Sequence, residues 1–242
     1  MNFTLVSHFH NEEVLLPAWV ARHQPLFDRM ILIDHQSTDE SRDIIEAIAP
    51  EAIVIPSKLT EFDAWQNDLE VMEIERQYYK APQMTLVLNT TESIVSEDFQ
   101  AAMLDHYNTS ELIDAWGIGS IILVDKGGIP SGTWGFKDPG HIRRKRYAHC
   151  ASDGNYHLGR HGTNLYSEDI ENVHILYSAF SPWPEVKNRK LQIQKRLSAH
   201  NVQSGLGFEH IQTSESLDTK YQEYLALSGG LSNIGLYNDS FV

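Results

Sequence analysis

Hydrophobic and polar positions alternate in blocks along the first hundred residues. Short apolar runs rich in β-branched residues predict strands, and stretches with apolar residues three or four positions apart predict helices. The expected strands cover 4–9, 29–34, 52–56 and 84–88, and the expected helices cover 14–24, 40–49 and 63–79. Strands separated by helices favour a parallel sheet with helices on its faces. The pattern predicts an α/β fold with a mainly parallel central sheet, in which the first two strands are neighbours.

The pattern becomes weaker after residue 100. Residues 98–107 and 184–200 predict helices, and residues 118–124 and 173–178 predict strands. The segment 127–140 is rich in Gly and Pro and predicts a loop. Because no internal repeat or low-complexity segment divides the chain, we expect a single domain over residues 1–242.

Polar side chains follow each of the four strands expected in the first half. These segments are His8–Glu13, Asp34–Asp39, Ser57–Lys58 and Asn89–Glu92. In α/β sheets, ligands bind outside the carboxyl ends of the parallel strands. Several polar strand ends at one edge of the sheet therefore predict a cleft for a polar ligand.

Composition and charge narrow the class of protein. The chain has 242 residues, of which 41% are hydrophobic, and this excludes a disordered, collagen-like or coiled-coil protein. Residues 1–100 hold 6 Lys and Arg against 18 Asp and Glu, which argues against binding to nucleic acid or an anionic membrane there. We find no secretory signal and no apolar run long enough for a transmembrane helix, and the single Cys150 excludes an internal disulfide. We expect a soluble, cytoplasmic protein.

Two basic clusters stand out in the second half, at residues 143–146 and 187–196. Such clusters are commonly solvated faces of the protein. The alternative is a local site for an anionic small molecule, because Arg side chains match phosphate oxygens.

Two of the polar strand ends carry a resemblance. The segment HNEEVLLPAWVARH (10–23), followed by DRMILIDHQSTDESRDII (28–45), resembles the opening of the family 2 glycosyltransferases. The likeness is closest to the branch with Asn-Glu-Glu and Asp-x-x-Ser-Thr-Asp, and it covers about residues 3–95. It implies the Rossmann-like glycosyltransferase A fold, with a nucleotide-binding half over about 1–100 and an acceptor-side half with a C-terminal helix over about 101–242.

The resemblance also implies an activity and a nucleotide site. The expected activity is hexosyl transfer from a nucleotide-sugar, above all a UDP-sugar, to a hydroxyl acceptor. By position, Glu12 and Asp34 match the acidic residues that hold the base and ribose in the family. The full set of expected nucleotide-binding residues is His10, Asn11, Glu12, Asp34 and Asn89.

The fourth strand end departs from the family pattern. The family has Asp-x-Asp there, and its carboxylates hold a divalent metal that bridges the diphosphate. This sequence has Asn89 and Thr91 at those positions and keeps only the charge of Glu92. Hard cations prefer charged oxygen ligands, so we expect manganese or magnesium to bind weakly at Glu92 or not at all. Restoring both Asp residues is expected to raise the affinity for manganese.

Basic residues could neutralise a diphosphate in place of the metal. The expected phosphate-binding residues are Arg143, Arg144, Lys145 and His161, beside Arg146 in the same cluster. Glycosyl transfer also needs a base that takes the proton of the acceptor hydroxyl. Asp138 is the candidate that we carry forward, with Glu168 and Asp169 as alternatives.

The sequence lacks the motifs that are typical of other cofactor-binding proteins. The sequence contains no phosphate-binding P-loop and no Gly-x-Gly-x-x-Gly after a strand, so we expect no NAD and no FAD, and we expect no haem. No Gly-x-Ser-x-Gly elbow indicates a hydrolase. Two classes of function stay open: a glycosyltransferase, and a non-catalytic relative that binds its ligand without the metal motif.

Overall fold

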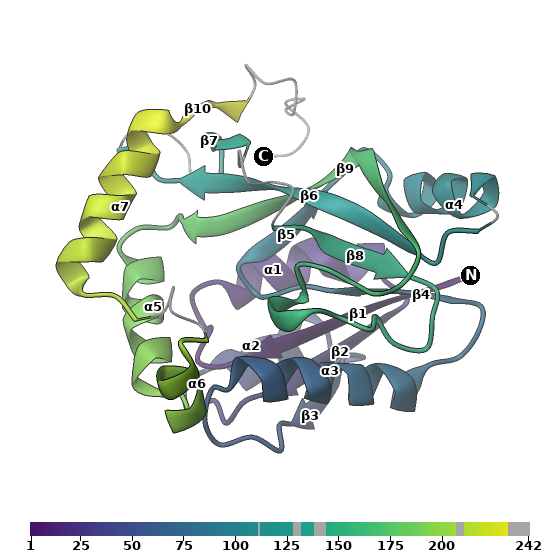
Figure 1. Cartoon of the computed structure of the whole chain (residues 1–242), viewed down its shortest axis with the longest axis horizontal. Coiled ribbons are helices and arrows are strands. Elements are labelled where there is room, and N and C mark those ends of the chain that lie inside the picture. Colours follow the sequence, from purple (N-terminus) through teal and green to yellow (C-terminus); the bar gives the residue numbers. More distant parts are fainter. Residues whose placement is uncertain (111, 128–131, 138–143, 207–210, 232–242) are drawn as a thin grey trace.

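The computed structural model describes residues 1–110, 112–127, 132–137, 144–206 and 211–231. Its strands form one ten-stranded sheet in the order β10-β7-β6-β8-β4-β1-β2-β3, and β9 pairs with both β5 and β6 (Figure 1). The strands are β1 (Asn2–Phe9), β2 (Arg29–Asp34), β3 (Ile53–Pro56), β4 (Gln83–Val87), β5 (Glu92–Val95), β6 (Ala115–Val124), β7 (Trp134–Lys137), β8 (Arg146–His149), β9 (Ser167–Phe180) and β10 (Gly229–Gly230). The helices are α1 (Leu16–His23), η1 (Gln24–Leu26), α2 (Ser41–Ile48), α3 (Ala64–Tyr78), α4 (Phe99–Thr109), η2 (Leu158–Arg160), α5 (Glu185–Lys195), α6 (Ala199–Ser204) and α7 (Ser214–Leu227).

The parallel part of the sheet, β3-β2-β1-β4, contains the four strands expected in the first half. Strand β1 pairs with β2 in parallel, from Thr4 opposite Arg29 to Phe9 opposite Asp34, which confirms that these strands are neighbours. Strand β4 is parallel to β1, and β3 is parallel to β2. Strand β8 then joins β4 to β6 through antiparallel pairing. The predicted α/β fold class is confirmed.

Helices cover both faces of the parallel strands. Successive side chains of a strand point to opposite faces of the sheet, so these strands contribute to two cores. Leu5 and Leu32 belong to the larger core, together with residues of α1, α2 and α4. Val6, Ile31 and Ile33 belong to the second core, which α3 covers. Both faces of these strands therefore pack against an apolar core.

Two expectations for the second half were wrong in detail. The Gly- and Pro-rich segment expected to be a loop contains β7, which pairs with β6. The single helix expected over 184–200 is divided, because α5 ends at Lys195 and Ser198 caps the N-terminus of α6. Within the described ranges, no helix is both long and apolar enough to cross a membrane.

Candidate active site

The two motifs that carry the family resemblance are hydrogen-bonded to each other. The backbone N–H of Asn11 donates to Ser37 Oγ at 3.1 Å, and the backbone N–H of Thr38 donates to Asn11 Oδ1 at 2.8 Å. The backbone N–H of Glu12 donates to Ser41 Oγ at 2.8 Å. The loops after β1 and β2 therefore form one rigid rim at the carboxyl ends of these strands.

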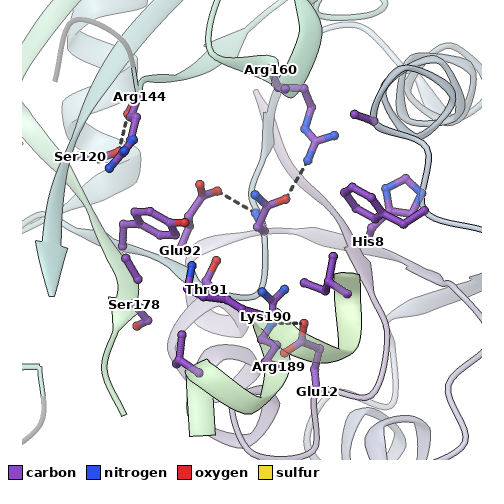
Figure 2. Close-up of a pocket in the computed structure, with 18 of the residues that line it drawn as sticks. His8, Glu12, Thr91, Glu92, Ser120, Arg144, Arg160, Ser178, Arg189 and Lys190 are labelled. Carbon is purple, nitrogen blue, oxygen red and sulfur yellow. Dashed lines mark hydrogen bonds and ion pairs between the residues drawn. The ribbon is translucent and has the colours of Figure 1, made fainter. Parts of the chain in front are cut away.

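A cavity of about 590 Å³ lies at this edge of the sheet. Its lining includes the carboxyl ends of β1 and β4, the end of β9, η2, and residues of α5 and α7. In the view of Figure 2, Arg144 and Arg160 lie across the pocket from Glu12 and Arg189, with Glu92 between them. The volume is in the range of binding sites for small molecules and cofactors.

The described lining of this cavity is more basic than the rest of the chain. Its cationic side chains are Arg144, Arg146, Arg160, Arg189, Lys190 and Lys220. Its carboxylates are Glu12, Asp68 and Glu92. The excess of three positive charges contrasts with the formal net charge of −14 of the whole chain. The cavity is therefore suited to an anionic ligand.

The predicted nucleotide-binding residues do not all face this cavity. His10, Glu12 and Asn89 line it, and Asn11 lines a smaller neighbouring cavity of about 270 Å³. Asp34 is not among the lining residues of either. Its Oδ1 accepts a hydrogen bond from the backbone N–H of Ser37 at 2.8 Å, so it closes the turn after β2.

Only some of the predicted phosphate-binding residues line the cavity. Arg144 and His161 line the cavity. Lys145 does not, because its ammonium group forms an ion pair with Asp169. Arg143 and the candidate base Asp138 lie outside the described residues. The alternative bases Glu168 and Asp169 are not part of the described lining.

Glu92 is held by a buried arginine. Arg146 Nε donates to Glu92 Oε2 at 2.8 Å and Arg146 Nη2 donates to Oε1 at 2.7 Å. Both side chains are buried. Burial alone would raise the pKa of the Glu92 carboxyl, but the charge and hydrogen bonds of Arg146 outweigh burial and lower this pKa. The pair is therefore ionised, with both carboxylate oxygens engaged.

The residues at this strand end do not fit a divalent metal. Asn89 Oδ1 accepts a hydrogen bond from Arg160 Nη2 at 2.7 Å, and both oxygens of Glu92 accept from Arg146. A guanidinium group thus faces the amide oxygen of Asn89 and both carboxylate oxygens of Glu92. Among the described residues, no group of three His, Cys, Asp or Glu side chains could hold a metal ion. Weak or no metal binding at Glu92 stays a prediction, and in the structure Glu92 is the partner of Arg146.

Two arginines of the site were missed by the sequence prediction. Arg189 Nε donates to Glu12 Oε1 at 2.6 Å, although the two residues are 177 positions apart in sequence. Arg189 lies in the basic cluster 187–196, so that cluster is the signal that could have found it. Arg160 lies in a Gly-rich segment with no such signal, and packing of η2 on α3 brings it to Asp68.

Three imidazoles line the strand-end side of the cavity. The ring centroids of His8 and His35 are 6.4 Å apart, and those of His10 and His35 are 6.3 Å apart. Burial lowers the pKa of all three groups, and that of His35 falls to about 4. These rings are therefore uncharged at neutral pH and supply hydrogen-bonding nitrogen atoms without adding charge.

The sequence matches no protein-family model and no curated protein. Among solved structures, S. aureus TarS 1-349 is similar with a TM-score of 0.40 and 15% identity, over 55% of this chain and 39% of that chain. Glucosyl-3-phosphoglycerate synthase from Mycobacterium tuberculosis has a TM-score of 0.37 and 15% identity, over 52% of this chain and 45% of that chain. The first is known with UDP-GlcNAc, and the second with Mn²⁺ and UDP-glucose. The chain spans less than half the length of either structure.

Proposed function

We propose that this protein is a glycosyltransferase that moves a hexosyl group from a nucleotide-sugar, above all a UDP-sugar, to a hydroxyl acceptor. The observation that carries the proposal is the interlocked pair of motifs at the rim of the cavity. Asn11 of the first motif bonds Ser37 and Thr38 of the second. The motifs that resemble family 2 glycosyltransferases are thus joined at the strand ends where such a fold binds its ligand.

The cavity offers chemistry for each part of such a donor. The strand-end imidazoles and Glu12 supply hydrogen-bonding groups for a nucleobase and a ribose. Arg144, Arg160 and Lys190 supply positive charge for a diphosphate, which carries two negative charges in a nucleotide-sugar. His161 is uncharged at neutral pH, because burial and the neighbouring Arg146 lower its pKa to about 4.

In the proposed reaction, the acceptor oxygen forms a bond to the anomeric carbon. The bond from that carbon to the phosphate oxygen breaks, and the nucleoside diphosphate leaves with the electron pair. The hydroxyl proton goes to a base. The three carboxylates of the described lining are ion-paired with Arg189, Arg160 and Arg146, so they are poor candidates for it. Asp138 stays our prediction for this role.

The non-catalytic alternative rests on one observation. Asn89 and Thr91 stand at the two positions where the family has carboxylates. A protein with this site could bind a nucleotide-sugar and not transfer the sugar. Binding and turnover must therefore be measured separately.

The test combines calorimetry with UDP and an assay for UDP release from UDP-glucose, UDP-galactose and UDP-GlcNAc. We expect UDP to bind and at least one donor to be turned over. Arg144→Gln should weaken UDP binding about tenfold, the effect of one lost charge-assisted hydrogen bond. Arg76→Gln is the matched control, because Arg76 pairs with Asp153 and does not line the cavity. Binding without turnover of any donor supports the non-catalytic alternative, and no nucleotide binding contradicts both.

A further inference from the structure

Arg160 and Arg146 lie where the family that the sequence resembles holds a divalent metal. Arg160 donates to Asn89, which stands at the first position of the Asp-x-Asp pattern, and Arg146 holds Glu92 just after it. We propose that the guanidinium group of Arg160, positioned by Arg146, binds the diphosphate of the donor directly and replaces the divalent metal. The inference rests on the proposed function.

Arg160 is held in place by several bonds. Its Nη1 pairs with Asp68, and its Nη2 donates to Asn89 Oδ1 at 2.7 Å. The backbone N–H of the preceding Gly159 donates to the same Asp68 carboxylate at 2.6 Å. Asp68 is buried, so the carboxylate is a fixed anchor on α3. Such anchoring orients the guanidinium before a ligand binds, which limits the entropy lost on binding.

The backbone at this point is in an unusual conformation. Gly159 has φ of +75° and Arg160 has φ of +59°. A left-handed conformation is uncommon for a residue with a side chain, and such residues cluster at functional sites. The hydrogen bonds that Gly159 and Arg160 donate to Asp68 hold this turn at the edge of the cavity.

Arg160 keeps donor capacity for a ligand. A guanidinium group has five N–H donors in a planar fork that matches phosphate oxygens. The contacts of Arg160 with Asp68 and Asn89 use its two Nη atoms. Its buried Nε–H has no hydrogen-bond partner within the part of the chain that the structure describes. A buried unsatisfied donor is costly, so a ligand oxygen that reached this N–H would gain a favourable hydrogen bond.

Arg146 supports this arrangement. Its Nη1 donates to the carbonyl oxygen of Gly159 at 2.7 Å, so it holds the turn that carries Arg160. Its ion pair with Glu92 also neutralises a carboxylate that would otherwise repel a diphosphate. Arg146 is therefore a positioning residue, and Arg160 is the residue expected to contact the phosphates.

The first experiment is titration of the full chain with UDP by calorimetry, once with EDTA and once with excess Mn²⁺. We expect the two dissociation constants to agree within about twofold, since a metal that bridged the diphosphate would change affinity by tenfold or more. UDP binding that requires Mn²⁺ would overturn the inference and leave the proposed function intact. If UDP, GDP, CDP and ADP all fail to bind under both conditions, the proposed function itself fails.

The second experiment compares variants at the anchor. Arg160→Gln should weaken UDP binding about tenfold or more while leaving the binding of uridine, which has no phosphate, unchanged. Because this variant leaves Asp68 unpaired and could fail to fold, the double variant Arg160→Gln/Asp68→Asn is measured as well and should show the same loss.

Asp68→Asn alone tests the anchor. It keeps the guanidinium group of Arg160 but removes the carboxylate that orients it, so UDP affinity should fall less than in Arg160→Gln and uridine affinity should not change. If Arg160 only supports the local structure, the Asp68 and Arg160 variants should weaken UDP and uridine binding alike. That result, or unchanged UDP affinity in a folded Arg160→Gln protein, would overturn the proposed role of Arg160.

Discussion

Asn89 connects Arg160 with Glu92, the partner of Arg146. Its backbone N–H donates to Glu92 Oε2 at 2.8 Å, and its amide oxygen accepts from Arg160. An Asp at this position would place a second carboxylate next to the Arg160 guanidinium. The resulting ion pair would occupy the cation that we expect to bind the diphosphate.

We therefore predict that Asn89→Asp weakens UDP binding about tenfold and does not create a manganese site. The family pattern predicts instead that restoring both Asp residues, Asn89→Asp with Thr91→Asp, raises the affinity for manganese. Calorimetry with UDP and with Mn²⁺ separates the two expectations. Asn108→Asp, which adds the same charge on an exposed position of α4, should change neither affinity. Stoichiometric manganese bound to the Asn89→Asp protein would contradict this prediction.

At the scale of elements, His23 joins α1 to β5. Its Nδ1–H donates to the carbonyl oxygen of Trp19 at 2.7 Å, and its Nε2 accepts from the backbone N–H of Ile94 at 3.2 Å. These partners fix the neutral ring with the proton on Nδ1, because a protonated ring would lose the bond from Ile94. Burial lowers the pKa of His23 to about 3.

The lowered pKa makes stability depend on pH. Unfolded His23 takes up a proton below its ordinary pKa of 6.5, whereas folded His23 does so only near 3. The contribution of His23 to the unfolding free energy is complete above its pKa in the unfolded chain and is lost as pH falls toward its pKa in the folded chain. Between about pH 7 and about pH 5, His23 should account for about 2 kcal/mol of lost unfolding free energy.

His23→Gln should be less stable than the native chain at neutral pH but lose less stability on acidification. Urea denaturation at the two pH values measures both quantities. His35 and His161 also have pKa values lowered to about 4, so some dependence on pH stays in the variant. An unchanged difference between the two pH values would contradict the role assigned to His23.

The sequence predicts the first half of the fold well because each element there has a strong local pattern. The apolar runs expected to be strands at 29–34 and 52–56 match β2 and β3 closely. The short strand β8 contains only Arg146–His149, beginning at the last residue of the basic cluster 143–146, and pairs with β4 and β6. Such a strand depends on its neighbours in the sheet rather than on its own sequence, so local patterns do not find it.

The residues of the candidate site also include some that the sequence predicts and some that it does not. Residues at strand ends, such as His10 and Asn89, follow from the pattern, because a parallel sheet brings its carboxyl ends together. Which of them face the cavity does not follow, since Asp34 turns to the backbone of Ser37 instead. Arg160 and Arg189 enter the site only through tertiary packing of distant segments, which no local spacing encodes.

At the scale of the molecule, the C-terminal half completes the edge of the sheet that contains the candidate nucleotide site. The backbone N–H of Phe62 donates to the carbonyl oxygen of Arg196 at 2.7 Å, and that of Ser198 donates to the carbonyl oxygen of Phe62 at 2.9 Å. The Ser198 hydroxyl donates to Asp63 Oδ2 at 2.8 Å. In the sheet, β8 covers the side of β4 that is not paired with β1. The two halves expected from the sequence are thus joined by hydrogen bonds and by a shared sheet.

We therefore predict that a fragment of residues 1–110 does not fold on its own, because it would expose β4 as an edge strand and lose the contacts of Phe62 and Asp63 with residues 196–198. Circular dichroism and thermal unfolding measure this outcome, and the fragment should show no cooperative transition. The full chain should unfold in a single transition, with the same midpoint by circular dichroism and by tryptophan fluorescence. Trp19 lies in the first half and Trp116 in the second, and both belong to the same core. The opposite outcome is a fragment that unfolds cooperatively and binds UDP as tightly as the full chain. That outcome would show that the nucleotide site is independent of Arg146, Arg160 and Arg189, and it would contradict the role assigned to these arginines.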